Sequence, residues 1–144
     1  IKTIRHYIEV ERLMAEKPFE YRIDWKTDLN AEELLIPPML IQPFVENAIR
    51  HGILNGPRPR ELKVEFTNND KFLKVTIIDN GIGIFSSQQQ KQKTDHQSMA
   101  LMVTKERLES ISGKNALEMS EIKLKDGRIG GTSIVFKIPL ETDY

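Results

Sequence analysis

The sequence of 144 residues predicts one mixed α/β domain with five or six strands and three helices. Two kinds of pattern carry this prediction. In three segments apolar residues recur every three or four positions, as they do on one face of a helix, and in shorter segments they alternate with polar residues, as in half-buried strands. A chain of this length can bury about two thirds of its unfolded surface within a single domain.

The three helical segments each have a plausible start or stop. They are expected at residues 1–17, 37–52 and 99–111. Pro18 ends the first, because proline cannot continue a helix. Pro43 lies in the first turn of the second or bends it, and Gly52 and Gly113 are the caps after the second and third.

The predicted strands are bounded by turn residues. They are residues 19–25, 62–66, 72–78, 116–119, 122–125 and 133–138. Asn68-Asn69-Asp70 joins the second and third as a hairpin, and Asp126-Gly127 is a turn before the last. Residues 86–97 contain no apolar side chain, so we expect a mobile surface loop there.

The composition excludes several classes of protein. Lys plus Arg equals Asp plus Glu, at 21 each, so no global field favours nucleic acid or anionic membrane. Cysteine is absent, which excludes disulfides and thiolate metal sites. No apolar run is long enough to span a bilayer. The chain opens with Ile1 inside an apparent helix, and we therefore expect a fragment of a longer protein.

The second predicted helix carries four polar side chains on adjacent turns. Residues three and four apart share a face, so Asn47, Arg50 and His51 form one cluster. Glu46 pairs with Arg50. An amide oxygen suits Mg²⁺, which keeps several waters while it bridges phosphates, and a guanidinium suits phosphate oxygens. A carboxylate can order a water or accept a proton. A solvated face with an intrahelical ion pair explains the same pattern.

A second motif follows the apolar strand at residues 75–78. Asp79 is expected where this buried strand ends, and its carboxylate needs a donor such as an adenine amino group. Gly81 and Gly83, with Ile84 behind them, let the backbone lie against a base or sugar. An ordinary Asn-Gly turn is the alternative. Together with the helix cluster, however, this motif predicts a site for a magnesium–nucleotide complex.

Several stretches resemble the motifs of one protein family. Residues 37–52 (PPMLIQPFVENAIRHG) resemble the N box of the LytS/YehU-type sensor histidine kinases, and residues 79–83 (DNGIG) resemble their first glycine box. Residues 104–108 resemble the segment after the second glycine box, and residues 130–139 the closing strand. The resemblance runs over essentially the whole chain in the right order.

The resemblance implies a fold and a division of the chain. The fold is that of the GHKL (Bergerat-fold) ATPases, an α+β two-layer sandwich in which a mixed, mostly antiparallel sheet packs against about three helices. Residues 1–17 would be the end of a linker helix from a missing dimerisation and phosphoacceptor region. Residues 18–144 would be the ATP-binding catalytic domain.

The resemblance also implies roles at the phosphate end of a bound nucleotide. Asn47 would hold Mg²⁺, and Arg50 and His51 would contact phosphates or ribose. Glu46 matches the acidic position linked with activating the attacking group. Residues 85–97 would form the lid over the phosphates.

At the base end, Asp79 would read the adenine amino group. Gly81 and Gly83, followed by Ile84, would line the base. Thr132 follows Gly130-Gly131 and would support Asp79 or a base-bound water, although a hairpin turn explains those glycines equally well.

The chain departs from the family at the second glycine box, usually Gly-x-Gly-Leu followed by Asn. Here the stretch reads Ser98-Met99-Ala100-Leu101, without either glycine. Glycine there would let backbone amides wrap the phosphates. Ala100 can still offer its N–H, Ser98 can cap the helix, and Leu101 keeps the family's residue. The departure concerns phosphate affinity and lid closure rather than the base pocket.

The resemblance finally implies partners. The family's phosphoacceptor histidine lies upstream, and His6 stands in the wrong context to replace it. We therefore expect a domain that donates the γ-phosphoryl group of Mg²⁺–ATP to a histidine outside this fragment, of the same or the partner protomer, and thence to a response regulator. The full protein would be a homodimer anchored in the bacterial inner membrane, with this domain in the cytoplasm and no role for nucleic acid.

Two alternatives stay open. One is a nucleotide-binding regulatory module without phosphotransfer, and the other is a serine kinase of the anti-sigma-factor type. The Ile-Pro-Pro and Gln-Pro pairs within residues 36–43 argue against the second.

Overall fold

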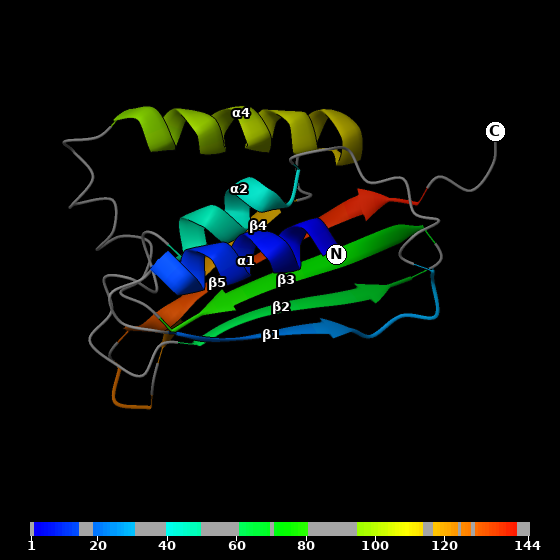
Figure 1. The fold of residues 1–144 in the computed structure, drawn as a ribbon. Helices are drawn as coiled ribbons and strands as arrows, with labels where there is room; N and C mark the ends of the chain where they lie inside the picture. Colours follow the sequence, from blue (N-terminus) through cyan, green and yellow to red (C-terminus); the bar gives the residue numbers. More distant parts are fainter. Residues whose placement is uncertain are drawn as a thin grey trace.

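The computed structural model describes residues 2–14, 19–30, 40–49, 61–69, 71–80, 95–113, 117–123, 125–127 and 129–140. These residues form a two-layer sandwich in which helices cover one face of a five-stranded sheet (Figure 1). The strands are β1 (Glu20–Trp25), β2 (Glu61–Asn68), β3 (Phe72–Asp79), β4 (Leu117–Lys123) and β5 (Ile129–Pro139). The helices are α1 (Lys2–Met14), α2 (Gln42–Asn47) and α4 (Asp95–Ser112). The predicted fold class is confirmed.

The sheet has the strand order β1-β2-β3-β5-β4 and is mostly antiparallel. β2 and β3 form the predicted hairpin, and β4 and β5 form a second. β1 and β2 are parallel, because the chain between them contains α2 and crosses over the helical face. The two hairpins meet where β3 pairs with β5.

The core lies between the sheet and the helices. Strand residues alternate between a buried, helix-facing set and a set on the open face, as the period of two requires. Phe44 of α2 packs on Phe136 of β5 with ring centroids 4.9 Å apart, which holds α2 over the centre of the sheet. Ile8 of α1 and Leu108 of α4 are fully buried in the same core.

The termini of the helices follow local chemistry. Pro43 lies in the first turn of α2, where its missing N–H costs nothing, as predicted. Ala48 and Ile49 continue α2 in a π-helical turn. Gly113 follows α4 with a φ of +97° and donates its N–H to the carbonyl of Glu109 at 2.9 Å, so the predicted cap is confirmed.

Several predicted boundaries are wrong. The second helix was expected from residue 37, but residues 40 and 41 are not helical and α2 begins at Gln42. The last strand was expected from residue 133 but begins at Ile129. Residues 116–119 and 122–125 were expected as separate strands, but Leu117–Lys123 is one strand with a register shift between Ile122 and Lys123. A strand at the edge of a sheet tolerates polar residues in its middle. In addition, α4 starts at Asp95, so the last residues of the predicted loop are helical. A polar stretch gives no apolar period, so the sequence pattern does not mark where this helix begins.

The first helix is part of the packed structure. Ile4 and Ile8 belong to the same hydrophobic cluster as the strands. Arg12 donates from Nε to the carbonyl of Phe19 at 2.8 Å, and the Tyr21 hydroxyl donates to Glu9. The boundary after residue 17 stays a prediction. Among the described helices, none has the length and hydropathy needed to cross a bilayer.

Candidate functional site

A carboxylate and a hydroxyl lie opposite each other where β3 ends. Asp79 is the last residue of β3, and its register partner on β5 is Thr132. Asp79 is 2% exposed and Thr132 is 5% exposed. Both residues fall on the helix-facing side, since Asp79 continues the alternation of the buried Val75 and Ile77. A buried carboxylate is costly unless hydrogen bonds offset its lost hydration. The sequence-predicted pair is therefore together, on the covered face.

A glycine lets β5 approach the backbone of this acid. An ideal Cβ on Gly131 would lie 1.9 Å from the carbonyl oxygen of Asp79 and 2.7 Å from the Cα of Asn80. The φ of Gly131 is +146°, which side chains rarely adopt. The alternative that Gly130-Gly131 forms a hairpin turn is wrong, because both residues lie within β5. The glycine is needed for close contact between strands.

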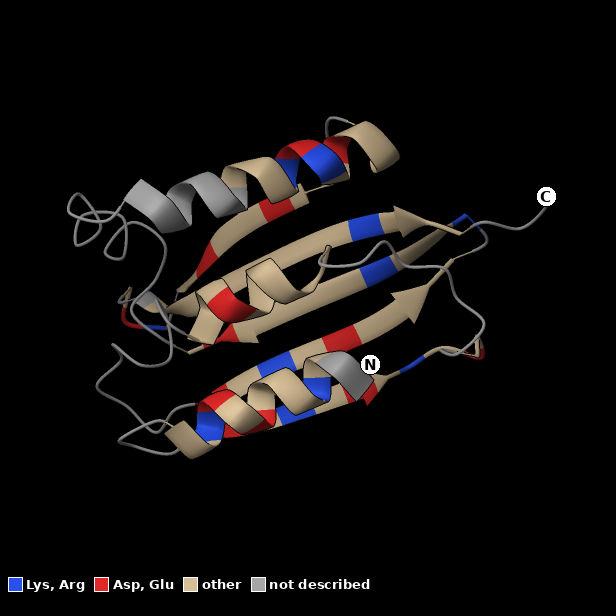
Figure 2. Ribbon diagram, turned by 45° about the horizontal axis from the view of Figure 1, so that its top comes forward, with Lys and Arg blue, Asp and Glu red and all other residues tan. Residues whose placement is uncertain are grey.

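The second predicted cluster lies at the end of α2. Glu46 and Asn47 are both half-buried there. Figures 1 and 2 both show that α2 and β3 end toward the same end of the sheet, on its helical side. The C-terminal ends of these two elements thus face the same end of the molecule. Within the described ranges, no group of three or more His, Asp or Glu side chains gathers as a metal cluster.

Several predicted site residues lie outside the described residues. They are Arg50, His51, Gly81, Gly83 and Ile84. Their predicted roles stay predictions.

The backbones of Ser98, Ala100 and Leu101 lie within α4. Ser98 is not the N-cap, because the helix begins three residues before it. Only the first four N–H groups of a helix lack a partner in the helix itself. Ala100 is the sixth residue of α4, where an N–H normally bonds to the carbonyl four residues earlier.

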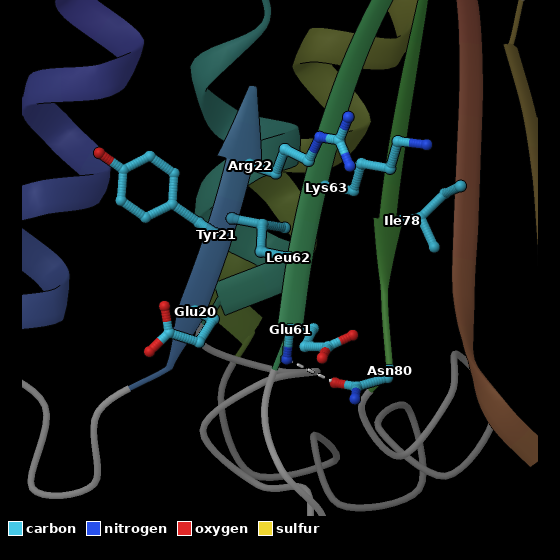
Figure 3. Close-up of a pocket in the computed structure, with 8 residues that line it drawn as sticks. All are labelled: Glu20, Tyr21, Arg22, Glu61, Leu62, Lys63, Ile78 and Asn80. Atoms are coloured by element: carbon cyan, nitrogen blue, oxygen red, sulfur yellow. Dashed lines mark hydrogen bonds between the residues drawn. The ribbon is translucent and has the colours of Figure 1, made fainter. Parts of the chain in front are cut away.

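A cavity of about 420 Å³ lies beside this end of the sheet (Figure 3). Arg22, Lys63 and Ile78 are register neighbours across β1, β2 and β3, on the face away from the helices. The full lining is Glu20, Tyr21, Arg22, Glu61, Leu62, Lys63, Ile78 and Asn80. Its two cations already pair with acids. Arg22 lies 2.7 Å from Asp24, and Lys63 lies 3.7 Å from Glu65.

Charged groups on the open face compensate one another. Figure 2 shows both signs of charge along β1 and β2. The Lys26 ammonium lies 2.8 Å from Glu65 and, as the donor of a hydrogen bond to it, holds the pKa of Glu65 below its ordinary value. The same contact raises the pKa of Lys26.

On the opposite side of β1, the hydrogen bond to Glu9, together with burial, raises the pKa of Tyr21.

One contact at the site was missed from the sequence. The side-chain oxygen of Asn80 accepts from the N–H of Glu61 at 2.8 Å, and the Asn80 N–H donates to the Glu61 carbonyl at 3.3 Å. The sequence offered the Asn-Gly pair as a turn signal. The partner could not be named without the register of β2 and β3.

The comparison with family models identifies the class of domain. Residues 38–142 match the family described as histidine kinase-, DNA gyrase B-, and HSP90-like ATPase. This match covers α2, α4 and the strands β2 to β5, and it therefore includes every site residue that the sequence predicted.

Curated relatives are sensor proteins that are much longer than this chain. The chain is 30% identical over 88 residues to the sensor protein LytS of Staphylococcus epidermidis, which is 61% of this chain and 15% of that protein. It is 25% identical over 140 residues to the sensor histidine kinase YesM of Bacillus subtilis, which is 97% of this chain and 23% of that protein. The chain thus spans less than a quarter of the length of these two relatives.

Solved structures share the fold. The mycobacterial sensor histidine kinase MprB superposes with a TM-score of 0.62 at 15% identity, over 99% of this chain and 95% of the solved chain. The family match over residues 38–142 covers more than two thirds of the chain. The chain belongs to the family of histidine kinase-, DNA gyrase B- and HSP90-like ATPases.

Proposed function

We propose that this chain is the ATP-binding catalytic domain of a sensor histidine kinase, which transfers the γ-phosphoryl group of ATP to a histidine outside these 144 residues. Family membership supports nucleotide binding, and the names of the relatives support the kinase role. The observation that carries the proposal is Asp79, a nearly fully buried carboxylate at the end of β3 with Thr132 opposite.

In this proposal the base end of the site recognises adenine. The Asp79 carboxylate accepts a hydrogen bond from the adenine amino group, which offsets part of the cost of burying it. Thr132 supports Asp79 or a water bound to the base. Gly81, Gly83 and Ile84 line the base. A carboxylate fits this task, because its oxygens are acceptors only.

The phosphate end is formed by the end of α2. Bound ATP supplies the phosphoryl group, and Mg²⁺ neutralises developing charge on it. Asn47 offers one oxygen, which fits a metal that is otherwise held by phosphates and water. Arg50 and His51 contact phosphates or ribose, and Glu46 orders or activates the attacking group. In such transfers positioning and charge neutralisation matter more than covalent chemistry by the protein.

Partners follow from this role. The acceptor is a histidine on a helix of the same or a partner protomer, and the phosphoryl group then passes to a response regulator. We propose a homodimeric full-length protein anchored in the membrane, with this domain in the cytoplasm. The relatives, of which this chain covers 15% and 23%, leave ample length for those parts.

A second candidate is a nucleotide-binding module without phosphotransfer. It is favoured by the helical backbone at Ser98, Ala100 and Leu101, in place of a glycine-containing phosphate loop. Incubating the chain with Mg²⁺–ATP and a histidine-containing helical fragment separates the two candidates. Phosphohistidine on the fragment supports the kinase, and nucleotide binding without transfer supports the module.

Asp79→Asn tests the nucleotide site itself. The amide has one acceptor fewer and introduces a competing donor, so we expect affinity for an ATP analogue to fall by roughly 30-fold or more, or about 2 kcal/mol. Calorimetry with and without Mg²⁺ measures it. Asp24→Asn is the matched control, because Asp24 is also a strand acid but lies on the open face and pairs with Arg22 at 2.7 Å. Unchanged affinity in Asp79→Asn removes Asp79 from the site.

A further inference from the structure

Asn80, the residue after Asp79, is hydrogen-bonded to Glu61 at the start of β2 through one backbone bond and one side-chain bond. Leu62 and Asp79 are register partners, so Glu61 and Asn80 form the next pair. In a hydrogen-bonded antiparallel pair, the backbone N–H of each residue normally donates to the backbone carbonyl of the other. Here the Asn80 N–H donates to the Glu61 carbonyl at 3.3 Å, but the Glu61 N–H donates to the side-chain oxygen of Asn80 at 2.8 Å. The carboxamide thus takes the place of a backbone carbonyl (Figure 3).

This contact satisfies the first N–H of β2 with a side chain instead of a backbone carbonyl. Together with the backbone bond from the Asn80 N–H to the Glu61 carbonyl, it attaches the end of β3 to β2.

Strand β5 contacts the backbone of Asp79 and Asn80 from the side opposite β2. Gly131 of β5 approaches so closely that an added Cβ would lie 1.9 Å from the Asp79 oxygen and 2.7 Å from the Asn80 Cα. Asp79 and Asn80 are thus confined between β2 and β5. Their backbone is fixed by two independent contacts, one on each neighbouring strand.

We propose that Asn80 is a positioning residue, whose side-chain bond to the Glu61 N–H fixes the backbone of Asp79 so that its buried carboxylate is pre-organised for the nucleotide. This role rests on the proposed function and deepens it. A group that recognises a ligand is effective only when its supporting contacts hold it within a fraction of an ångström. Asn80 itself does not touch the nucleotide in this proposal.

Three variants of the chain test the role. Asn80→Ala removes the acceptor, Asn80→Asp keeps an oxygen acceptor, and Glu61→Ala is the matched control because only the backbone of Glu61 takes part. In the nucleotide-free chain, we expect Asn80→Ala to speed hydrogen exchange of the amide at position 61 by about tenfold. Asn80→Asp and Glu61→Ala should keep that amide protected.

Binding of an ATP analogue is the second measurement. We expect Asn80→Ala to weaken it by about tenfold, Glu61→Ala to leave it unchanged, and Asn80→Asp to recover most of the loss. Wild-type affinity in Asn80→Ala, with the amide at position 61 exchanging freely, overturns the positioning role alone. The positioning role is also overturned if Asn80→Asp keeps neither the protection of the amide at position 61 nor the affinity for the ATP analogue. A wild-type chain that binds no nucleotide overturns the proposed function, and the positioning role falls with it.

Discussion

Asp79 and Asp24 are both acidic residues within strands of one sheet, but they lie on opposite faces. Asp79 is 2% exposed and follows the buried Val75 and Ile77 on the helical side. The side chain of Asp24 is 13% exposed on the open side, with Arg22 at 2.7 Å and Lys63 at 3.9 Å. The first acid lies among apolar strand positions, and the second lies among cations.

We propose that this difference separates a charge that binds a ligand from charges that pair with one another. On the open face, neighbouring cations explain each acid without reference to a ligand, and such pairs contribute little to stability. On the helical face, burying a carboxylate is costly unless hydrogen bonds offset its lost hydration, so we look for a role of Asp79 that an apolar residue could not fill. The three predictions below, in order of expected size, test this contrast between the faces.

The largest effect is expected from Gly131→Ala. The new methyl group would meet the Asp79 carbonyl at 1.9 Å, and φ is +146°, so strain and overpacking both act. We expect the free energy of unfolding to fall by about 3 kcal/mol or more, measured by urea denaturation. Gly113→Ala is the control, since its φ is +97° but nothing lies within 4 Å, and it should cost about 1 kcal/mol. Equal costs would refute the close contact between β5 and Asp79.

An intermediate effect is expected from Asn47→Ala. Loss of the amide oxygen at the end of α2 should weaken Mg²⁺-dependent binding of an ATP analogue by about tenfold, because one metal ligand is lost. Binding without Mg²⁺ should change little. Calorimetry at fixed nucleotide with and without metal gives the comparison. An equal loss in both conditions would assign Asn47 to the fold or to the nucleotide directly.

The smallest effect is expected from Lys26→Ala on the open face. Because Lys26 lowers the pKa of Glu65, that contact adds stability above the ordinary pKa of a glutamate and loses it as pH falls through the lowered value. Removing Lys26 should raise the pKa of Glu65, as followed by NMR titration. The unfolding temperature at neutral pH should stay unchanged within error, since exposed pairs contribute little. A marked drop would show that the open face has a larger structural role.

The sequence predicted elements whose signals are local. The β2–β3 hairpin, Pro43 in the first turn of α2 and the cap at Gly113 each depend on a few neighbouring residues. Asp79 and Thr132 are register partners, and the predicted support of one by the other stays a prediction.

Other features depended on contacts between distant segments. Ser120 and Glu121 suggested a break in β4, but pairing with β5 carries the strand through them. The start of α4 at Asp95 is hidden within a polar stretch. The bond between Asn80 and Glu61 requires the strand register, which an alternating pattern does not specify at its ends.

The pairing of Asp79 with Thr132 also bears on the order of folding. β2 with β3, and β4 with β5, are hairpins that close over short stretches of chain, whereas β3 meets β5 only across a long intervening segment that includes α4. Local pairings form sooner, because less chain entropy is lost before contacts are gained. The acid and the hydroxyl therefore come together when the two hairpins dock. Nucleotide affinity would then report docking of the hairpins, and a destabilised chain could keep both hairpins after losing it.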